Sequence, residues 1–91
     1  MVVTLEETKL YLRVDGDEED TLITNFISTA EELCAGILRY PLVDLVEIPE
    51  AIKQSVLFAV GNLYQQRENT DMKSLLQVMT RLLFAHRQEE W

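Results

Sequence analysis

The chain has 91 residues, 47% of them hydrophobic, and this length and composition are those of one small folded domain. A single cysteine excludes an internal disulfide framework, and no apolar run approaches the roughly 20 residues that a membrane-spanning helix needs. The formal net charge of −8 argues against a protein that grips nucleic acid phosphates nonspecifically.

The negative charge is concentrated in the first half of the chain. Residues 1–50 contain 12 acidic and 3 basic side chains, whereas residues 51–91 contain 4 acidic and 5 basic ones. Such a division can be an accident of solvated surfaces. It also occurs where one part of a protein meets a complementary surface, so both interpretations stay open.

The first predicted helix covers residues 5–14. Thr4 and Glu7 form the capping-box pattern of a helix start, in which each side chain accepts a hydrogen bond from the other residue's backbone N–H. Gly16 stands where a helix C-terminus often requires a left-handed residue, a conformation that glycine adopts at little cost. Asp17 is then the expected N-cap of a second helix, whose first turn carries three acids that the helix dipole favours: Glu18, Glu19 and Asp20.

The second predicted helix covers residues 18–39. Its apolar residues recur at helical spacing and form a broad stripe: Ile23, Phe26, Ile27, Ala30, Leu33, Cys34, Ile37 and Leu38. The helix should end near Tyr40, because a residue before proline disfavours helical geometry. Residues 41–48, PLVDLVEI, have no partner strand in the chain and are interpreted as an extended linker with apolar anchors.

Two further helices are predicted, over residues 49–68 and 72–88. The third has Pro49 at its first helical position, and its apolar stripe consists of Ile52, Val56, Ala59, Val60 and Leu63. The fourth is capped by Thr70 or Asp71, and its stripe consists of Leu75, Leu76, Met79, Leu82, Leu83 and His86. Residues 1–91 are therefore predicted to form one all-α domain, a small bundle of about four helices. The bundle is predicted to have two long central helices, with a short helix before them and a further helix at the C-terminal end.

The acidic stretch LRVDGDEEDTLI, residues 12–23, also resembles a metal-binding loop in composition. A calcium loop of the EF-hand type requires acids at positions 1, 3 and 5, glycine at position 6 and glutamate at position 12. Counted from Asp15, the first three requirements are met by Asp15, Asp17 and Glu19, but position 6 is Asp20 and position 12 is Phe26. Because the two most diagnostic positions fail, the stretch is interpreted as a joint between helices, and no metal ion or cofactor is expected.

No residue pattern in the chain is typical of catalysis. His86 lies on an apolar stripe without other ligands beside it, and Cys34 lies on a core stripe, where a cysteine usually packs as a small hydrophobe. Adjacent carboxylates are interpreted as solvated helix faces: Glu6 and Glu7, Glu31 and Glu32. We expect no enzymatic activity. The lone cysteine and the absence of a basic region followed by an apolar stretch in MVVTLEETK favour the cytoplasm over secretion.

Several apolar residues lie off the core stripes. Phe58 and Phe84 are displaced from the stripes of their helices, Phe84 by about half a turn from Leu75 at roughly 100° per residue. Polar and basic residues share the outer face with Phe84: Lys73, Gln77, Arg81 and Gln88. The first helix is also two-sided, with Leu10 and Val14 apart from Leu5 and Leu12. Such residues on a small domain, with Trp91, indicate surfaces that partners bury.

Three segments carry motifs in a fixed order. TLEETKLYLRVDGDEEDTLITNFISTAEEL has a short helix, an LR-[IV]-D joint followed by acids, and a long amphipathic helix. IPEAIKQSVLFAVGNLYQQRE is similar to a P-x-A-[IL]-K-x-A helix that ends in Y-x-x-R-E, here Tyr64, Arg67 and Glu68. LLFAHR is similar to LL-x-x-[YF]-R, with His86 where an aromatic residue is usual. Over nearly the whole chain these segments resemble the phage head–tail connector family.

The resemblance implies a structural phage or prophage protein, an adaptor also called a DNA-packaging protein, with no enzymatic activity and no cofactor. It implies an oligomeric ring of these subunits, formed under the portal protein, that extends the DNA channel and docks the next neck or tail-completion protein. DNA would pass through the channel without sequence-specific binding, and no membrane partner is implied. The location would be the virion neck, after assembly in the host cytoplasm.

The charge division leads us to expect head-to-tail association, in which the acidic first half of one subunit faces the basic outer side of its neighbour. The candidate contact residues on the acidic side are Glu18, Glu19 and Asp20. Those on the basic and aromatic side are Phe58, Arg67, Lys73, Arg81, Phe84, Arg87 and Trp91. The alternative is a small acidic regulator or inhibitor that binds a basic partner protein, which the size and the charge allow equally well.

Overall fold

The computed structural model describes residues 2–39, 42, 47–66 and 71–84. It contains four α-helices: α1 (Leu5–Leu12), α2 (Asp20–Leu38), α3 (Glu50–Gln65) and α4 (Met72–Leu83). No strand occurs in the described ranges. The all-α bundle predicted from the sequence is therefore confirmed, although the described helices are shorter than the predicted ones.

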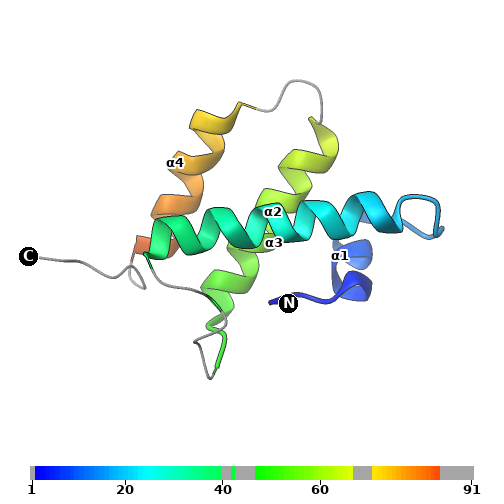
Figure 1. The fold of residues 1–91 in the computed structure, drawn as a ribbon, viewed down its shortest axis with the longest axis horizontal. Coiled ribbons are helices and arrows are strands. Elements are labelled where there is room, and N and C mark those ends of the chain that lie inside the picture. Colours follow the sequence, from blue (N-terminus) through cyan, green and yellow to red (C-terminus); the bar gives the residue numbers. More distant parts are fainter. Residues whose placement is uncertain (1, 40–41, 43–46, 67–70, 85–91) are drawn as a thin grey trace, which may run out of the picture.

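The long helix α2 crosses α3, and the two form the most extensive helix contact of the molecule (Figure 1). The helix α4 packs against α3 and against the C-terminal half of α2, whereas α1 packs against α3 and the N-terminal half of α2. The helices α1 and α4 thus lie toward opposite ends of α2 (Figure 1). Within the described residues, no helix has both the length and the hydropathy that a membrane span requires.

The core lies between the apolar stripes of α2, α3 and α4. The described stripe residues of α2 and α3 that are fully buried match the sequence-based expectation: Ile23, Ile27, Ala30, Cys34, Leu38, Ile52, Val56, Ala59 and Val60. In α4, Leu75, Met79 and Leu83 are buried as predicted, but Leu82 is 40% exposed, so its assignment to the core stripe was wrong. It lies in the last turn of α4, at the edge of the stripe.

The start of α1 has the predicted capping box. The backbone N–H of Glu7 donates to Thr4 Oγ1 at 3.0 Å, and the backbone N–H of Thr4 donates to Glu7 Oε1 at 3.1 Å. The hydroxyl of Thr8, which is fully buried, donates to the Thr4 carbonyl at 2.9 Å. These bonds satisfy amide groups that a helix start otherwise leaves unpaired.

The end of α1 differs from the expectation. The left-handed residue is Arg13, with φ 61°, and no glycine of the described chain has a positive φ, so the role given to Gly16 was wrong. The amide groups of Arg13 and Val14 donate to the carbonyls of Leu10 and Lys9, respectively. The left-handed residue that ends the helix therefore lies three residues before the expected Gly16. The Glu18 carboxylate fills the space that a Cβ at position 16 would take.

The starts of α2 and α3 also require corrections. The N-cap of α2 is Glu19, which makes no side-chain capping bond, because the helix begins at Asp20 and the carboxylate of Asp17 instead contacts Lys9. Pro49 is the N-cap of α3, with ψ 144°, and is not its first helical residue. The predicted cap of α4 is confirmed, since Asp71 Oδ1 accepts the backbone N–H of Ser74 at 3.2 Å.

Candidate subunit interface

The acidic end of the molecule consists of residues 13–20 and the adjoining end of α1. Lys9 Nζ lies 2.7 Å from Asp20 Oδ1 and 3.3 Å from Asp17 Oδ1, and it therefore joins α1 to the start of α2. The hydrogen bond to Asp20, with a further one to Asp17, raises the pKa of Lys9 above its ordinary value against the opposing effect of desolvation. Part of the predicted acidic surface is thus neutralised within the chain.

The three acids predicted to face a neighbour have different environments. Asp20 is held by Lys9, and Glu19 Oε1 accepts the hydroxyl hydrogen of Tyr64 at 2.5 Å, which links the start of α2 to the end of α3. Glu18 is exposed and lies over Gly16. The exposed carboxylates of Asp15 and Asp17 lie in the same segment, so it still presents negative charge to solvent.

Two further carboxylates, interpreted from the sequence as solvated, hold α1 in place. Glu7 Oε2 lies 2.8 Å from Lys53 Nζ on α3, and the Glu31 carboxylate on α2 accepts the backbone N–H of Val2 at 2.5 Å. The hydrogen bond from Lys53, followed by that from the Thr4 backbone, lowers the pKa of Glu7. The segment around α1 is therefore attached to both central helices.

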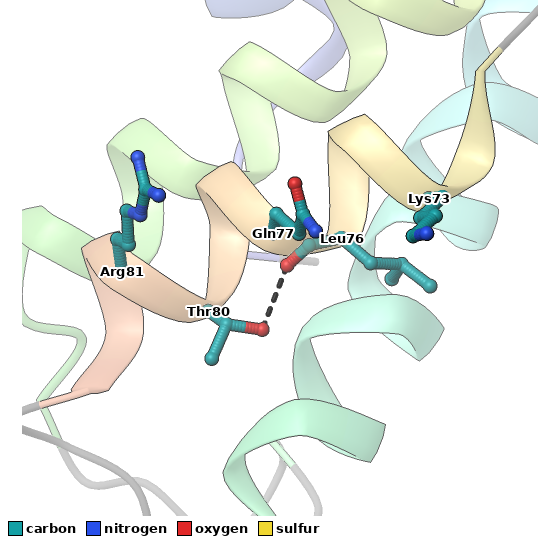
Figure 2. A pocket seen from close by; sticks show the side chains of 5 residues that line it. All are labelled: Lys73, Leu76, Gln77, Thr80 and Arg81. Carbon is teal, nitrogen blue, oxygen red and sulfur yellow. Dashed lines mark hydrogen bonds between the residues drawn. The ribbon is translucent and has the colours of Figure 1, made fainter.

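The outer face of α4 is basic. Lys73, Gln77 and Arg81 are exposed, and with Leu76 and Thr80 they line a hollow of about 460 Å³, here called the basic hollow. Figure 2 shows Gln77 and Arg81 pointing away from the side of α4 that carries Thr80. Phe84, directly after α4, is 64% exposed. The structure thus brings two of the predicted contact residues, Lys73 and Arg81, to one hollow, and exposes Phe84 at the end of the same helix.

A second hollow adjoins the first. The α2/α4 groove has a volume of about 500 Å³ and is lined by Leu33, Gly36, Ile37, Leu76 and Thr80. The Thr80 hydroxyl donates to the Leu76 carbonyl at 2.7 Å, so this polar group is satisfied within the helix (Figure 2). The sequence analysis did not find this groove. The glycine in the last turn of α2, Gly36, was its only signal in the sequence.

The remaining predicted contact residues are not brought into this surface. Phe58 is half-buried and packs against the core, so its place in an interface stays a prediction. Arg67, Arg87 and Trp91 lie outside the described residues, as does His86. At the opposite end of the molecule, α1 exposes two apolar side chains that the prediction did not include among its contact residues, Leu10 at 80% and Tyr11 at 47%.

The described residues offer no arrangement with a clear catalytic use. In this part of the chain, no group of three or more His, Cys, Asp or Glu side chains is placed to hold a metal ion. Cys34 is fully buried, and its thiol donates to Ser55 Oγ at 3.8 Å. Desolvation raises the pKa of this thiol to about 11, so it stays protonated near neutral pH.

Comparison with known proteins identifies the family. No curated protein and no solved structure gives a significant match to the chain. The family model of the phage gp6-like head-tail connector protein matches residues 2–86, which include all four helices. The resemblance seen in the sequence motifs is thereby confirmed, and it assigns the protein a structural role in a phage. This chain belongs to the phage gp6-like head-tail connector protein family.

Proposed function

We propose that the chain is the subunit of a ring that assembles under the phage portal protein, extends the DNA channel and docks the next neck or tail-completion protein. The observation that carries this proposal is the placement of two unlike surfaces at opposite ends of one small domain. The acidic segment lies at the start of α2, and the basic hollow lies on α4 beside its other end (Figure 1). Head-to-tail contacts between unlike surfaces generate closed rings when the rotation between subunits permits.

Charge and apolar burial have different parts in this association. Lys73 and Arg81 form no ion pair with another described residue, and in the proposed contact they meet Glu18 of the next subunit. Exposed ion pairs contribute only about 0–1 kcal/mol each, so charge sets the orientation of the subunits. Apolar side chains such as Phe84 supply most of the affinity.

The net charge also bears on DNA. With a net charge of −8, a ring of these subunits is strongly acidic, and acid that faces the channel repels the phosphate backbone. The duplex then passes through without sequence-specific binding. Fluorescence anisotropy with a labelled duplex should show no binding at physiological salt. Tight binding that weakens steeply with added salt would contradict this part of the proposal.

The proposal is tested by mixing the purified chain with purified portal protein of the same phage and imaging the mixture by negative stain, with mass measurement in parallel. A ring of subunits on one face of the portal is the expected result. A chain that stays monomeric and does not bind the portal at any concentration would overturn the proposal. Recovery of that monomer with a tightly bound basic protein would instead establish the acidic regulator.

The orientation of the subunits is tested by charge reversal. Arg81→Glu should weaken assembly on the portal, because it places a negative charge in the basic hollow. Arg13→Glu is the contrasting variant, since it changes the net charge equally but adds negative charge to the acidic segment, so it should not weaken assembly. Sedimentation profiles that are the same for Arg81→Glu and the parent at all concentrations would contradict the proposed orientation.

A further inference from the structure

We infer that the α2/α4 groove receives Leu10 from α1 of the neighbouring copy of this chain. The inference rests on the proposed ring, and it names the apolar contact that the charges alone do not specify. Four observations carry it: an unexplained glycine in the groove, a rigidly held apolar side chain on α1, charges that match around the two, and the distance that separates them within one chain.

Gly36 lines the groove, and no contact among the described residues requires a glycine there. It lies in the last turn of α2, two residues before the helix ends, and glycine favours helix less than alanine does, by at most about 0.5–1 kcal/mol. Its φ is not positive, so no turn requires it. A Cβ at this position would meet no atom within 4 Å, so no neighbouring segment of the described chain requires it either. The missing side chain therefore makes room for a group from outside.

Leu10 is the apolar group suited to this room. Its side chain is 80% exposed, the highest value among the large hydrophobic residues of the described chain. Its helix α1 begins with the Thr4 capping box and is held by two ion pairs, one from Lys9 to the start of α2 and one from Glu7 to α3. Because α1 is already rigid, burial of Leu10 in a partner loses little conformational entropy. The groove volume of about 500 Å³ is within the range of pockets that bury small ligands.

The surroundings of the two groups are complementary. Beside the groove lies the basic hollow with Lys73 and Arg81. Beyond Leu10 the chain continues into the acidic segment, in which Asp15, Asp17 and Glu18 are exposed. A contact between two copies of α4 would instead bring basic hollows together, and like charges oppose such an arrangement. The charges therefore favour α1 of a second copy, and not α4 of a second copy, as the occupant of the groove.

The occupant belongs to a different molecule because Leu10 does not reach its own groove. Lys9, the residue before Leu10, is bound to Asp20 at the first turn of α2. From Asp20 to Gly36 the helix extends roughly 24 Å at 1.5 Å per residue. The helices α1 and α4 accordingly lie toward opposite ends of α2 (Figure 1). Each subunit therefore presents one α1 and one groove, and insertion of one into the other repeats around a ring.

The first test fills the groove. Gly36→Leu should leave the fold intact, because the site has open space and leucine favours helix, but it should weaken assembly on the portal at least about tenfold. Leu10→Ala should weaken assembly to a similar extent. Leu82→Ala is the matched control, since Leu82 is also exposed on a helix but lines neither hollow. Circular dichroism and unfolding midpoints establish that each variant folds.

The outcomes separate this inference from the proposed ring. If the parent chain forms rings on the portal and Gly36→Leu forms them equally well, the groove is not the contact, although the ring stands. If the parent forms no ring, the proposed function itself is wrong, and the inference falls with it. Loss of assembly in Gly36→Leu and Leu10→Ala, with Leu82→Ala unaffected, supports the inference.

The second test is a disulfide between copies. A chain carrying both Leu10→Cys and Gly36→Cys should give a ladder of covalent oligomers on a non-reducing gel after assembly and oxidation, because each copy joins two neighbours. A disulfide requires Cα atoms within about 7 Å, so the two positions are too far apart within one chain. The buried Cys34, whose pKa is about 11, does not compete near neutral pH. Assembled rings of this variant that give no ladder would contradict the inference.

Discussion

Lys9 Nζ lies 2.7 Å from Asp20 Oδ1, and this contact ties the end of α1 to the first turn of α2. Only 15% of the Lys9 side chain and 33% of the Asp20 side chain is exposed, whereas Asp17, at 3.3 Å from the same ammonium group, is 94% exposed. Water therefore screens the contact with Asp17 far more than the contact with Asp20. Because both carboxylates contact the same Lys9 ammonium group but differ in exposure, substitutions at the two positions can be compared directly.

Asp20→Asn should shift the urea unfolding midpoint to a clearly lower concentration, because it weakens the partly buried contact that holds α1. Asp17→Asn should leave the midpoint within error of the parent. Circular dichroism during urea titration measures both, and an unchanged slope shows that the denatured state is the same. Equal shifts for the two substitutions would contradict the distinction between the contacts.

The two helical glycines of the described chain should respond differently to alanine. Gly36→Ala should raise the free energy of unfolding by up to about 0.5–1 kcal/mol, because alanine favours helix and the added Cβ meets open space. Gly61→Ala should raise the free energy of unfolding less, since its Cβ would lie 3.3 Å from Tyr11 Cε2 and the ring would have to move. Chemical denaturation measures both values.

Tyr11→Ala provides the control for this comparison. Without the Tyr11 ring, Gly61→Ala should recover the gain seen at Gly36, because the close contact no longer exists. The unfolding free energies of Gly36→Ala and Gly61→Ala can be compared in the parent and in the Tyr11→Ala background. If their difference is the same in both, the ring does not limit substitution at Gly61.

Stability should fall at acidic pH. The bond from Lys53 lowers the pKa of Glu7 below its ordinary value of 4.5, and the bonds from Ser74 lower the pKa of Asp71 below 3.8. In both cases the folded state binds the proton less readily than the unfolded state. Their stabilisation is therefore fully present above about pH 4.5 and is lost as the pH falls through the lowered pKa values.

Thermal unfolding between pH 2 and 7 checks this expectation. The Glu7→Gln variant should lose less stability than the parent on acidification, because one of the responsible groups is absent. The exposed neighbour provides the control, and Glu6→Gln should follow the parent curve. If Glu7→Gln and the parent lose the same thermal stability on acidification, the contact with Lys53 does not contribute to the pH dependence of stability.

The thiol of Cys34 should be almost inert in the folded protein. With a pKa raised to about 11 from an ordinary 9.0, its thiolate fraction at pH 8 is roughly a hundredfold lower than that of a free thiol, and burial blocks access as well. Reaction with a disulfide reagent should be slow under native conditions and fast in denaturant. A Leu10→Cys variant, with its second thiol exposed, should show one immediately reactive group and one slow group. Immediate reaction of Cys34 in the native parent would contradict its burial.

The sequence analysis located the exposed basic residues of the candidate interface because amphipathic periodicity is a local property. Lys73, Arg81 and Phe84 are on the outer face of α4, as their spacing from Leu75 predicts. The groove next to them escaped prediction because two helices that are distant in the chain form it. Residues Leu33 and Leu76 approach only when α4 packs on α2.

The sequence by itself determined the four helices, most of their buried faces and two of their caps, because residues three or four apart decide these features. It also determined the family, through motifs that keep their order along the chain. Only the tertiary structure decided which acids remain available to a partner. Contacts over 11 and 45 residues bind Asp20 to Lys9 and Glu19 to Tyr64, and no local pattern encodes such pairs. Helix packing likewise placed the groove and Leu10 at opposite ends of one domain, since their separation depends on where α1 and α4 meet α2.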